Sequence, residues 1–277
     1  MVSTSLINSA ISRYAFGDRP GDLPIPAPVS VEERWMHAVV LGGQGRYAAA
    51  RAGLDELLRR ERSGPVASLA SSTRASLLRQ TGWHRQASAW DGRALAVLAG
   101  VEDRDRGLLF AAARCDALTG LAADALGCGR LALGWQLLGR CQEDLMVFED
   151  RVGAAAVWRQ RVRLHWVSAE LALAGADFGE AGRHARAASE IAERAESVRH
   201  RVKSDLLLAA TMTGEPDARP AAELAGNVLT RAERHGLVPL KWAASMLLSG
   251  VTFDSSWEAE REACELLIRR RGGRFNV

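Results

Sequence analysis

The sequence contains little of what catalysis or metal binding requires. It has no G-x-S-x-G, G-x-x-x-x-G-K-[ST] or H-E-x-x-H segment, and no strand-glycine-helix pattern for dinucleotides. None of its six histidines has another histidine three or four residues away, so no helical metal pair is present. We therefore expect a non-catalytic protein that needs no metal or cofactor.

The few cysteines exclude the common metal and disulfide patterns. Cys115, Cys128, Cys141 and Cys264 form no C-x-x-C pair. The 13-residue steps between the first three rotate successive side chains by about 220° around a helix, so they do not share a face. We expect buried, reduced thiols.

Lysine is nearly absent, because only Lys203 and Lys241 among the 36 basic residues are lysines. Together with the high Ala, Gly and Leu content, this bias indicates a GC-rich genome such as that of an actinobacterium. The 33 acidic residues leave a net charge of +3, which gives no electrostatic reason to expect a nucleic-acid or membrane partner.

Targeting segments and long apolar runs are also missing. The first residues carry no basic region followed by an apolar core, as a signal peptide would. No stretch reaches the roughly 18 apolar residues of a membrane span. These absences predict a soluble, cytoplasmic protein.

What the chain does contain is a glycine that recurs every 36 to 47 residues. The recurring positions are Gly45, Gly82, Gly129, Gly175, Gly214 and Gly250. At most of them an Ala/Leu-rich helix precedes the glycine and an amphipathic helix follows it, which is typical of stacked helical hairpins. The pattern predicts an all-α fold of about six antiparallel helical hairpins.

A segment rich in proline and glycine, residues 15–29, separates two parts of the chain. It predicts an N-terminal arm over residues 1–29, with a short helix before the linker, and a repeat domain over 30–277. Ser30 and Glu33 form a capping box that starts the repeat domain, and Ser255 and Glu258 form a second one near its end. The arm carries Phe16, Leu23 and Ile25, and we leave open whether it docks into the chain's own groove.

The first hairpin reads Gly45-Arg-Tyr47-x2-Ala50-x3-Leu54. It resembles the tetratricopeptide repeat (TPR) family, whose second helix carries Y-x2-A-x3-F after a small turn residue. The resemblance covers roughly residues 30–271, although Trp35 is shifted from the family's tryptophan position. It implies a right-handed superhelix similar to the repeat domains of bacterial transcriptional regulators and signalling adaptors.

In such superhelices the first helix of each hairpin lines the concave face. The candidate partner-binding groove comprises Arg79, Asp116, Thr119, Arg163, Trp166, Glu170, Arg201 and Asp205. Arginine and tryptophan in one stripe suit an acidic-apolar peptide or a chain terminus. The alternative is that Arg163 and Arg201 pair internally with Glu170 and Asp205. The tryptophans beside turns, such as Trp83, and His84 are assigned to packing.

The function that this pattern favours is a non-catalytic protein-protein interaction module that binds a protein or peptide in the groove, in transcriptional or stress regulation. Two alternatives remain open: a ligand-sensing domain for a small molecule or short peptide, and a self-assembling structural unit. A broad polar channel would favour protein segments, whereas a closed, tryptophan-lined pocket would favour a small ligand. The partner and the oligomeric state are not encoded in the stacking residues.

Overall fold

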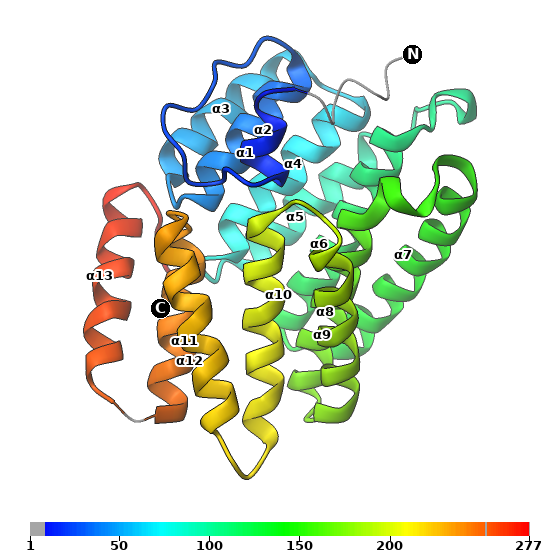
Figure 1. Ribbon diagram of the computed structural model, residues 1–277. Helices are drawn as coiled ribbons and strands as arrows, with labels where there is room; N and C mark the ends of the chain where they lie inside the picture. The colour runs from blue at the N-terminus through cyan, green and yellow to red at the C-terminus, as the bar shows by residue number, and fades with distance from the viewer. Residues whose placement is uncertain (1–8, 253, 277) are drawn as a thin grey trace.

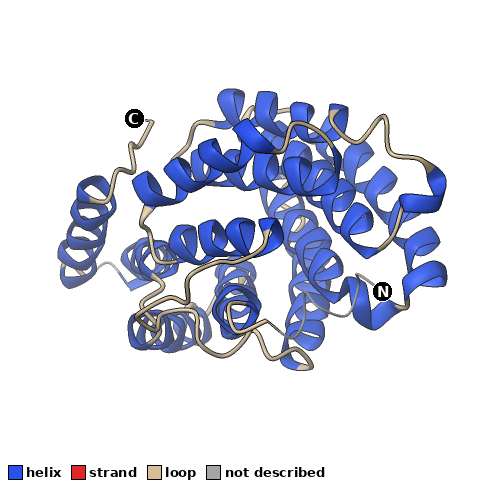
Figure 2. Ribbon diagram, turned by 90° about the horizontal axis from the view of Figure 1, so that it is seen from above, coloured by secondary structure: helices blue, strands red, loops and turns tan. Residues whose placement is uncertain are grey.

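The structure of the protein, a computed structural model, describes residues 9–252 and 254–276. Every regular element within these residues is a helix, so the all-α prediction is confirmed (Figure 2). The α-helices are α1 (Ser12–Phe16), α2 (Val31–Gly43), α3 (Tyr47–Arg60), α4 (Gly64–Arg79), α5 (His84–Ala96), α6 (Leu108–Gly127), α7 (Leu131–Val152), α8 (Trp158–Ala174), α9 (Phe178–Glu193), α10 (Val198–Thr211), α11 (Arg219–Arg234), α12 (Val238–Thr252) and α13 (Ser256–Arg270). The short 3-10 helices are η1 (Asp103–Asp105), η2 (Ala154–Val157) and η3 (Met212–Gly214).

The helices pack as neighbouring pairs along the chain. From α2 onward each helix contacts the next one, and each even-numbered helix also contacts the next even-numbered helix (Figure 1). The even-numbered helices therefore form a continuous layer, and the odd-numbered helices pack beside it. Small residues such as Ala38, Ala50 and Ala87 are fully or almost fully buried and allow close helix approach.

Left-handed backbone conformations end several of the even-numbered helices. Gly45, Gly82 and Gly129 have φ angles of 73°, 86° and 73°, which side chains with a Cβ rarely adopt. At the fourth predicted turn the residue with the left-handed backbone conformation is Ala176, whose φ is 60°, and not Gly175. The prediction of a turn at Gly250 is wrong, because this residue lies inside α12.

One of the two predicted capping boxes is present in modified form. Ser30 Oγ accepts a hydrogen bond from Glu33 N at 3.1 Å, and Glu33 Oε2 accepts from Val29 N at 2.7 Å, one residue earlier than expected. At the start of α13 the Ser255 side chain makes no capping bond. Asp254 Oδ1 accepts from Ser256 N there, because the chain turns one residue earlier than the sequence pattern implies.

The last helices contact the first ones. Ala48 N donates to Arg271 O at 2.9 Å, and Arg271 Nη1 donates to Gln44 O at 2.7 Å. Asn276 N, close to the C-terminus, donates to Thr81 O at 2.8 Å. In Figure 1 the blue N-terminal helices accordingly lie next to the orange and red C-terminal ones. The α2–α3 turn is therefore covered by the residues that follow α13.

The N-terminal arm lies across this junction. Of the short helix expected before the linker, α1 covers Ser12–Phe16, and residues 1–8 lie outside the described part. Val198 N donates to Gly17 O at 3.1 Å, and Gln44 Nε2 donates to Pro20 O at 3.0 Å. The arm therefore bridges α10 to the α2–α3 turn.

Among the described helices, none combines the length with the apolar character that crossing a bilayer requires.

Candidate functional site

The residues predicted to line a groove all lie on the even-numbered helices α4, α6, α8 and α10. Asp116, Thr119 and Trp166 are buried, and the remaining members are partly buried, so none of them is exposed. Their polar groups already have partners within the chain. The structure thus brings these residues to one layer, but it does not present them as an open surface.

Internal pairing is present, but the partners differ from those expected. Arg163 Nε lies 3.0 Å from Asp116 Oδ1, and Arg201 Nη1 donates to Ala195 O at 2.7 Å. Glu170 Oε1 accepts from Lys203 Nζ at 3.2 Å, and Asp205 pairs with Arg231. The pairing does run across adjacent helices, as expected for Arg163, Glu170 and Asp205, but the partners are Asp116, Lys203 and Arg231.

The predicted groove residue Arg79 joins two carboxylates that the sequence reasoning missed. Arg79 Nε donates to Asp124 Oδ1 at 2.7 Å, and Nη2 donates to Asp91 Oδ2. Ser72 Oγ also donates to Asp91 Oδ1 at 2.7 Å. Gly120 makes room for this carboxylate, because a Cβ there would lie 2.2 Å from Asp91 Oδ2.

The sequence does contain a pattern that indicates the burial of Asp91 and Asp124. Asp91 lies between Ala87 and Ala94 on the apolar face of α5, and Asp124 lies within an uninterrupted apolar stretch of α6. A charged residue in a core register requires a buried partner. Applied to α5 and α6, that argument predicts buried cationic partners for Asp91 and Asp124, which the structure supplies as Arg79.

Burial raises the pKa of Asp91 to about 7, against the opposing effects of Arg79 and Ser72. An unfolded chain would release this proton near pH 4, since the ordinary aspartate pKa is about 3.9. Between about pH 4 and pH 7 the folded state therefore holds a proton that the unfolded state has lost. Stability should fall as the pH rises through this window.

We expect Asp91→Asn to remove that slope, because asparagine keeps the shape and does not titrate. The wild-type free energy of unfolding should decline relative to the variant by up to about 1.4 kcal/mol per pH unit. Urea unfolding of both proteins across the window measures the difference. If the free energies of unfolding of the two proteins change in parallel across this pH window, Asp91 is ionised throughout it and the prediction is wrong.

An aromatic cluster lies between the middle of α8 and the first half of α10. The rings of Trp166 and His200 stack with centroids 5.2 Å apart, and Trp166 Nε1 donates to Ser204 Oγ at 2.9 Å. Phe16 of the arm packs against His200 at 6.2 Å and lies 5.1 Å below the Arg159 guanidinium. The predicted anchor Trp166 is therefore used internally, and the arm covers this side.

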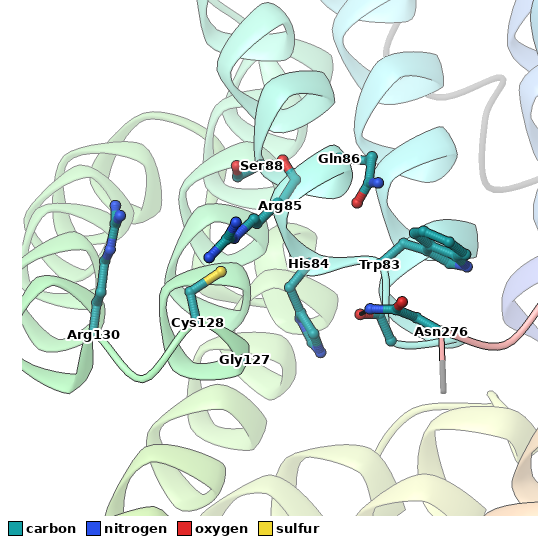
Figure 3. Close-up of a pocket in the computed structure, with 10 residues that line it drawn as sticks. Trp83, His84, Arg85, Gln86, Ser88, Gly127, Cys128, Arg130 and Asn276 are labelled. Atoms are coloured by element: carbon teal, nitrogen blue, oxygen red, sulfur yellow. Dashed lines mark hydrogen bonds between the residues drawn. The ribbon is translucent and has the colours of Figure 1, made fainter.

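An open pocket of about 940 Å³ lies at the C-terminal ends of α4 and α6. Its walls come from the start of α5, the α6–α7 turn and the C-terminal segment (Figure 3). The lining residues are Gly82, Trp83, His84, Arg85, Gln86, Ser88, Gly127, Cys128, Arg130 and Asn276. None of the predicted groove residues belongs to this set.

The pocket is positively charged. Arg85 and Arg130 are exposed and flank Cys128 in Figure 3, and no carboxylate is among the lining residues. α5 and α7 both begin here without a side-chain cap. Free backbone amides at helix starts add positive potential. The pocket can therefore accept carboxylates.

Cysteine reactivity should report directly on this pocket. Cys128 is exposed, whereas Cys115, Cys141 and Cys264 are buried. We expect one thiol per chain to react rapidly with a disulfide reagent under native conditions and the other three only on unfolding. Cys128→Ser should abolish the rapid phase, and a rapid phase that survives this substitution would contradict the burial of the others.

Histidines that are far apart in the sequence meet in space. His165 Nδ1 and His184 Nδ1 lie 2.9 Å apart, and His184 Nε2 lies 3.0 Å from Glu180 Oε1. Sequence spacing missed this pair because its members lie on different helices. Within residues 9–252 and 254–276, no group of three or more His, Cys, Asp or Glu residues is arranged to hold a metal ion.

The chain matches no protein-family model. No curated protein sequence matches it either. The resemblance to tetratricopeptide repeats therefore stays a prediction, and the site has to be interpreted from its own chemistry.

Proposed function

We propose that the protein is a non-catalytic interaction module that binds an acidic peptide segment of a partner protein in the pocket of Figure 3. Its framework would be a tetratricopeptide-like right-handed superhelix of about six hairpins, with the last hairpin in contact with the first. The proposal keeps the expected class of partner and moves the binding surface from the inner helices to the helix ends.

One observation carries the proposal: a wall of the pocket already holds an extended segment. Trp83 Nε1 donates to Arg274 O at 2.5 Å, and Asn276 Nδ2 donates to Gly82 O at 3.2 Å. Asn276 N also donates to Thr81 O, so two of the three contacts use backbone carbonyls of the α4–α5 turn and the third uses the Trp83 side chain. An extended peptide is recognised by the same kind of main-chain bonds.

The open shape and the charge of the pocket support a peptide over a compact metabolite. Small-molecule sites are mostly apolar and enclose most of their ligand, whereas this pocket is open and lined by polar and basic groups. Guanidinium groups bind carboxylates in a bidentate manner. Arg85 and Arg130 therefore favour segments that contain aspartate, glutamate or a chain terminus.

Selection from a displayed peptide library tests the proposal. We expect the wild type to enrich acidic peptides, and Arg85→Glu with Arg130→Glu to weaken their binding by at least about tenfold, or about 1.4 kcal/mol. The matched control is Arg62→Glu with Arg140→Glu, which reverses two exposed charges outside the pocket. Failure to enrich acidic sequences, or equal loss in both double variants, would contradict the proposal.

A further inference from the structure

Two arginines bind one carboxylate within the layer of even-numbered helices, and a third arginine lies on the neighbouring helix. Arg159 donates to Asp116 through Nη1 and Nη2 at 3.1 and 2.7 Å, and Arg163 Nε lies 3.0 Å from the same carboxylate. Arg199, on the neighbouring helix α10, has no carboxylate within ion-pair distance among the described residues. The single hydrogen bond of its side chain is a long one, from Nη1 to Val39 O at 3.4 Å.

Nearby groups supply only part of the missing negative charge. Glu170 is neutralised by Lys203, whereas Asp91 and Asp124 share Arg79 and supply at most one further negative charge, which acts on Arg163. Burial holds the pKa of His200 well below its ordinary range, so this ring stays neutral. Arg159 and Arg163 thus have Asp116 and part of this shared charge, whereas the positive charge of Arg199 has no ion-pair partner among the described residues.

The three arginine side chains are partly buried. The side chains of Arg159 and Arg163 keep 12% and 23% of their accessible surface, and Arg199 is also only partly buried. A Cβ added to Gly43 of α2 would lie 3.2 Å from Arg199 Nη1, so this group projects between α10 and α2. Phe16 covers Arg159 from the arm side. The cluster is therefore largely covered by protein, and its guanidinium groups keep part of their surface accessible.

Uncompensated charge in a protein interior is unfavourable unless a counter-charge accompanies it. Several guanidiniums that converge on one point bind an oxyanion through charge-assisted hydrogen bonds. We propose that the Arg159–Arg163–Arg199 cluster binds an oxyanion of the phosphate or sulfate type, either as the free ion or as the terminal group of a small metabolite. This site is separate from the peptide pocket, and neither proposal depends on the other.

Calorimetric titration of the full chain with inorganic phosphate, at constant ionic strength set by chloride, tests the proposal. We expect saturable binding by the wild type, at least about tenfold weaker binding by Arg199→Gln, and unchanged binding by the exposed control Arg62→Gln. Titration with methyl phosphate then separates the two sources: binding of both supports the terminal group of a metabolite, and binding of inorganic phosphate alone supports the free ion.

Stability in phosphate-free buffer distinguishes a binding role from a structural one. Because Arg199 carries an unpartnered charge, Arg199→Gln should unfold at a temperature equal to or above that of the wild type, and phosphate should raise the melting temperature of the wild type only. No saturable binding by the wild type would overturn the proposal. A phosphate response of equal size in Arg199→Gln, or a folded variant with a lower melting temperature and unchanged phosphate affinity, would also overturn it.

Discussion

Replacing Arg79 by methionine should lower the free energy of unfolding by about 3–5 kcal/mol, because it removes the guanidinium that hydrogen-bonds two buried carboxyl groups and leaves the Asp124 charge without it. The side chains of Asp91 and Asp124 have no accessible surface, and Arg79 donates hydrogen bonds to both. Water cannot replace the lost guanidinium at such a site without opening the contacts between α4, α5 and α6. Urea unfolding of the wild type and the variant measures the loss.

A surface ion pair provides the matched control. Arg60→Met removes the partner of Glu56, which is exposed, and should cost less than about 1 kcal/mol. Adding Asp91→Asn and Asp124→Asn to Arg79→Met should recover much of the loss, because the unpaired charges are then gone. Equal stability of Arg79→Met and Arg60→Met would show that the network is hydrated and contributes little.

Tyr47→Ala should also cost about 3–5 kcal/mol, as expected for the removal of a buried aromatic ring. Tyr47 is 1% exposed, and its hydroxyl donates to Gln80 Oε1 at 2.9 Å. Its ring also packs beside Gly273, where a Cβ would lie 2.9 Å from Tyr47 Cδ2. One side chain therefore joins the first helix pair to the C-terminal segment.

Hydrogen exchange can show whether this contact joins the two ends. In Tyr47→Ala we expect faster amide exchange in α13 as well as in α3, because both lose packing at the same place. Tyr47→Phe keeps the ring and should cost only about 1 kcal/mol, mainly through the bond to Gln80. Faster exchange confined to α3 would contradict a closed arrangement of the first and last helices.

The helical content could be predicted because it depends on local patterns. Alternating Ala/Leu faces and the left-handed glycines at 45, 82 and 129 mark helices and turns within a few residues. Gly250 misled the prediction, since a glycine within a helix cannot be told from one at a turn by type alone. The contact of Arg271 with Gln44 joins residues far apart in the chain and has no local pattern.

The candidate site was predictable only in part, because it too depends on contacts between residues far apart in the chain. The stripe of Arg163, Trp166 and Glu170 does lie on one helix, as the spacing indicates, but packing against α6 and α10 buries it. The pocket combines turn residues such as Arg85 and Arg130 with Asn276 of the C-terminal segment. These residues meet because the C-terminal segment contacts the α4–α5 turn, which no local sequence pattern indicates.

The most direct test of the account measures where an acidic peptide binds. Fluorescence anisotropy with a peptide selected on the wild type compares Arg85→Gln plus Arg130→Gln with Arg201→Gln, which alters the inner layer. We predict at least about tenfold weaker binding for the pocket variant and wild-type affinity for Arg201→Gln. Loss of binding in Arg201→Gln with wild-type affinity in the pocket variant would contradict the account and return the site to the inner helices.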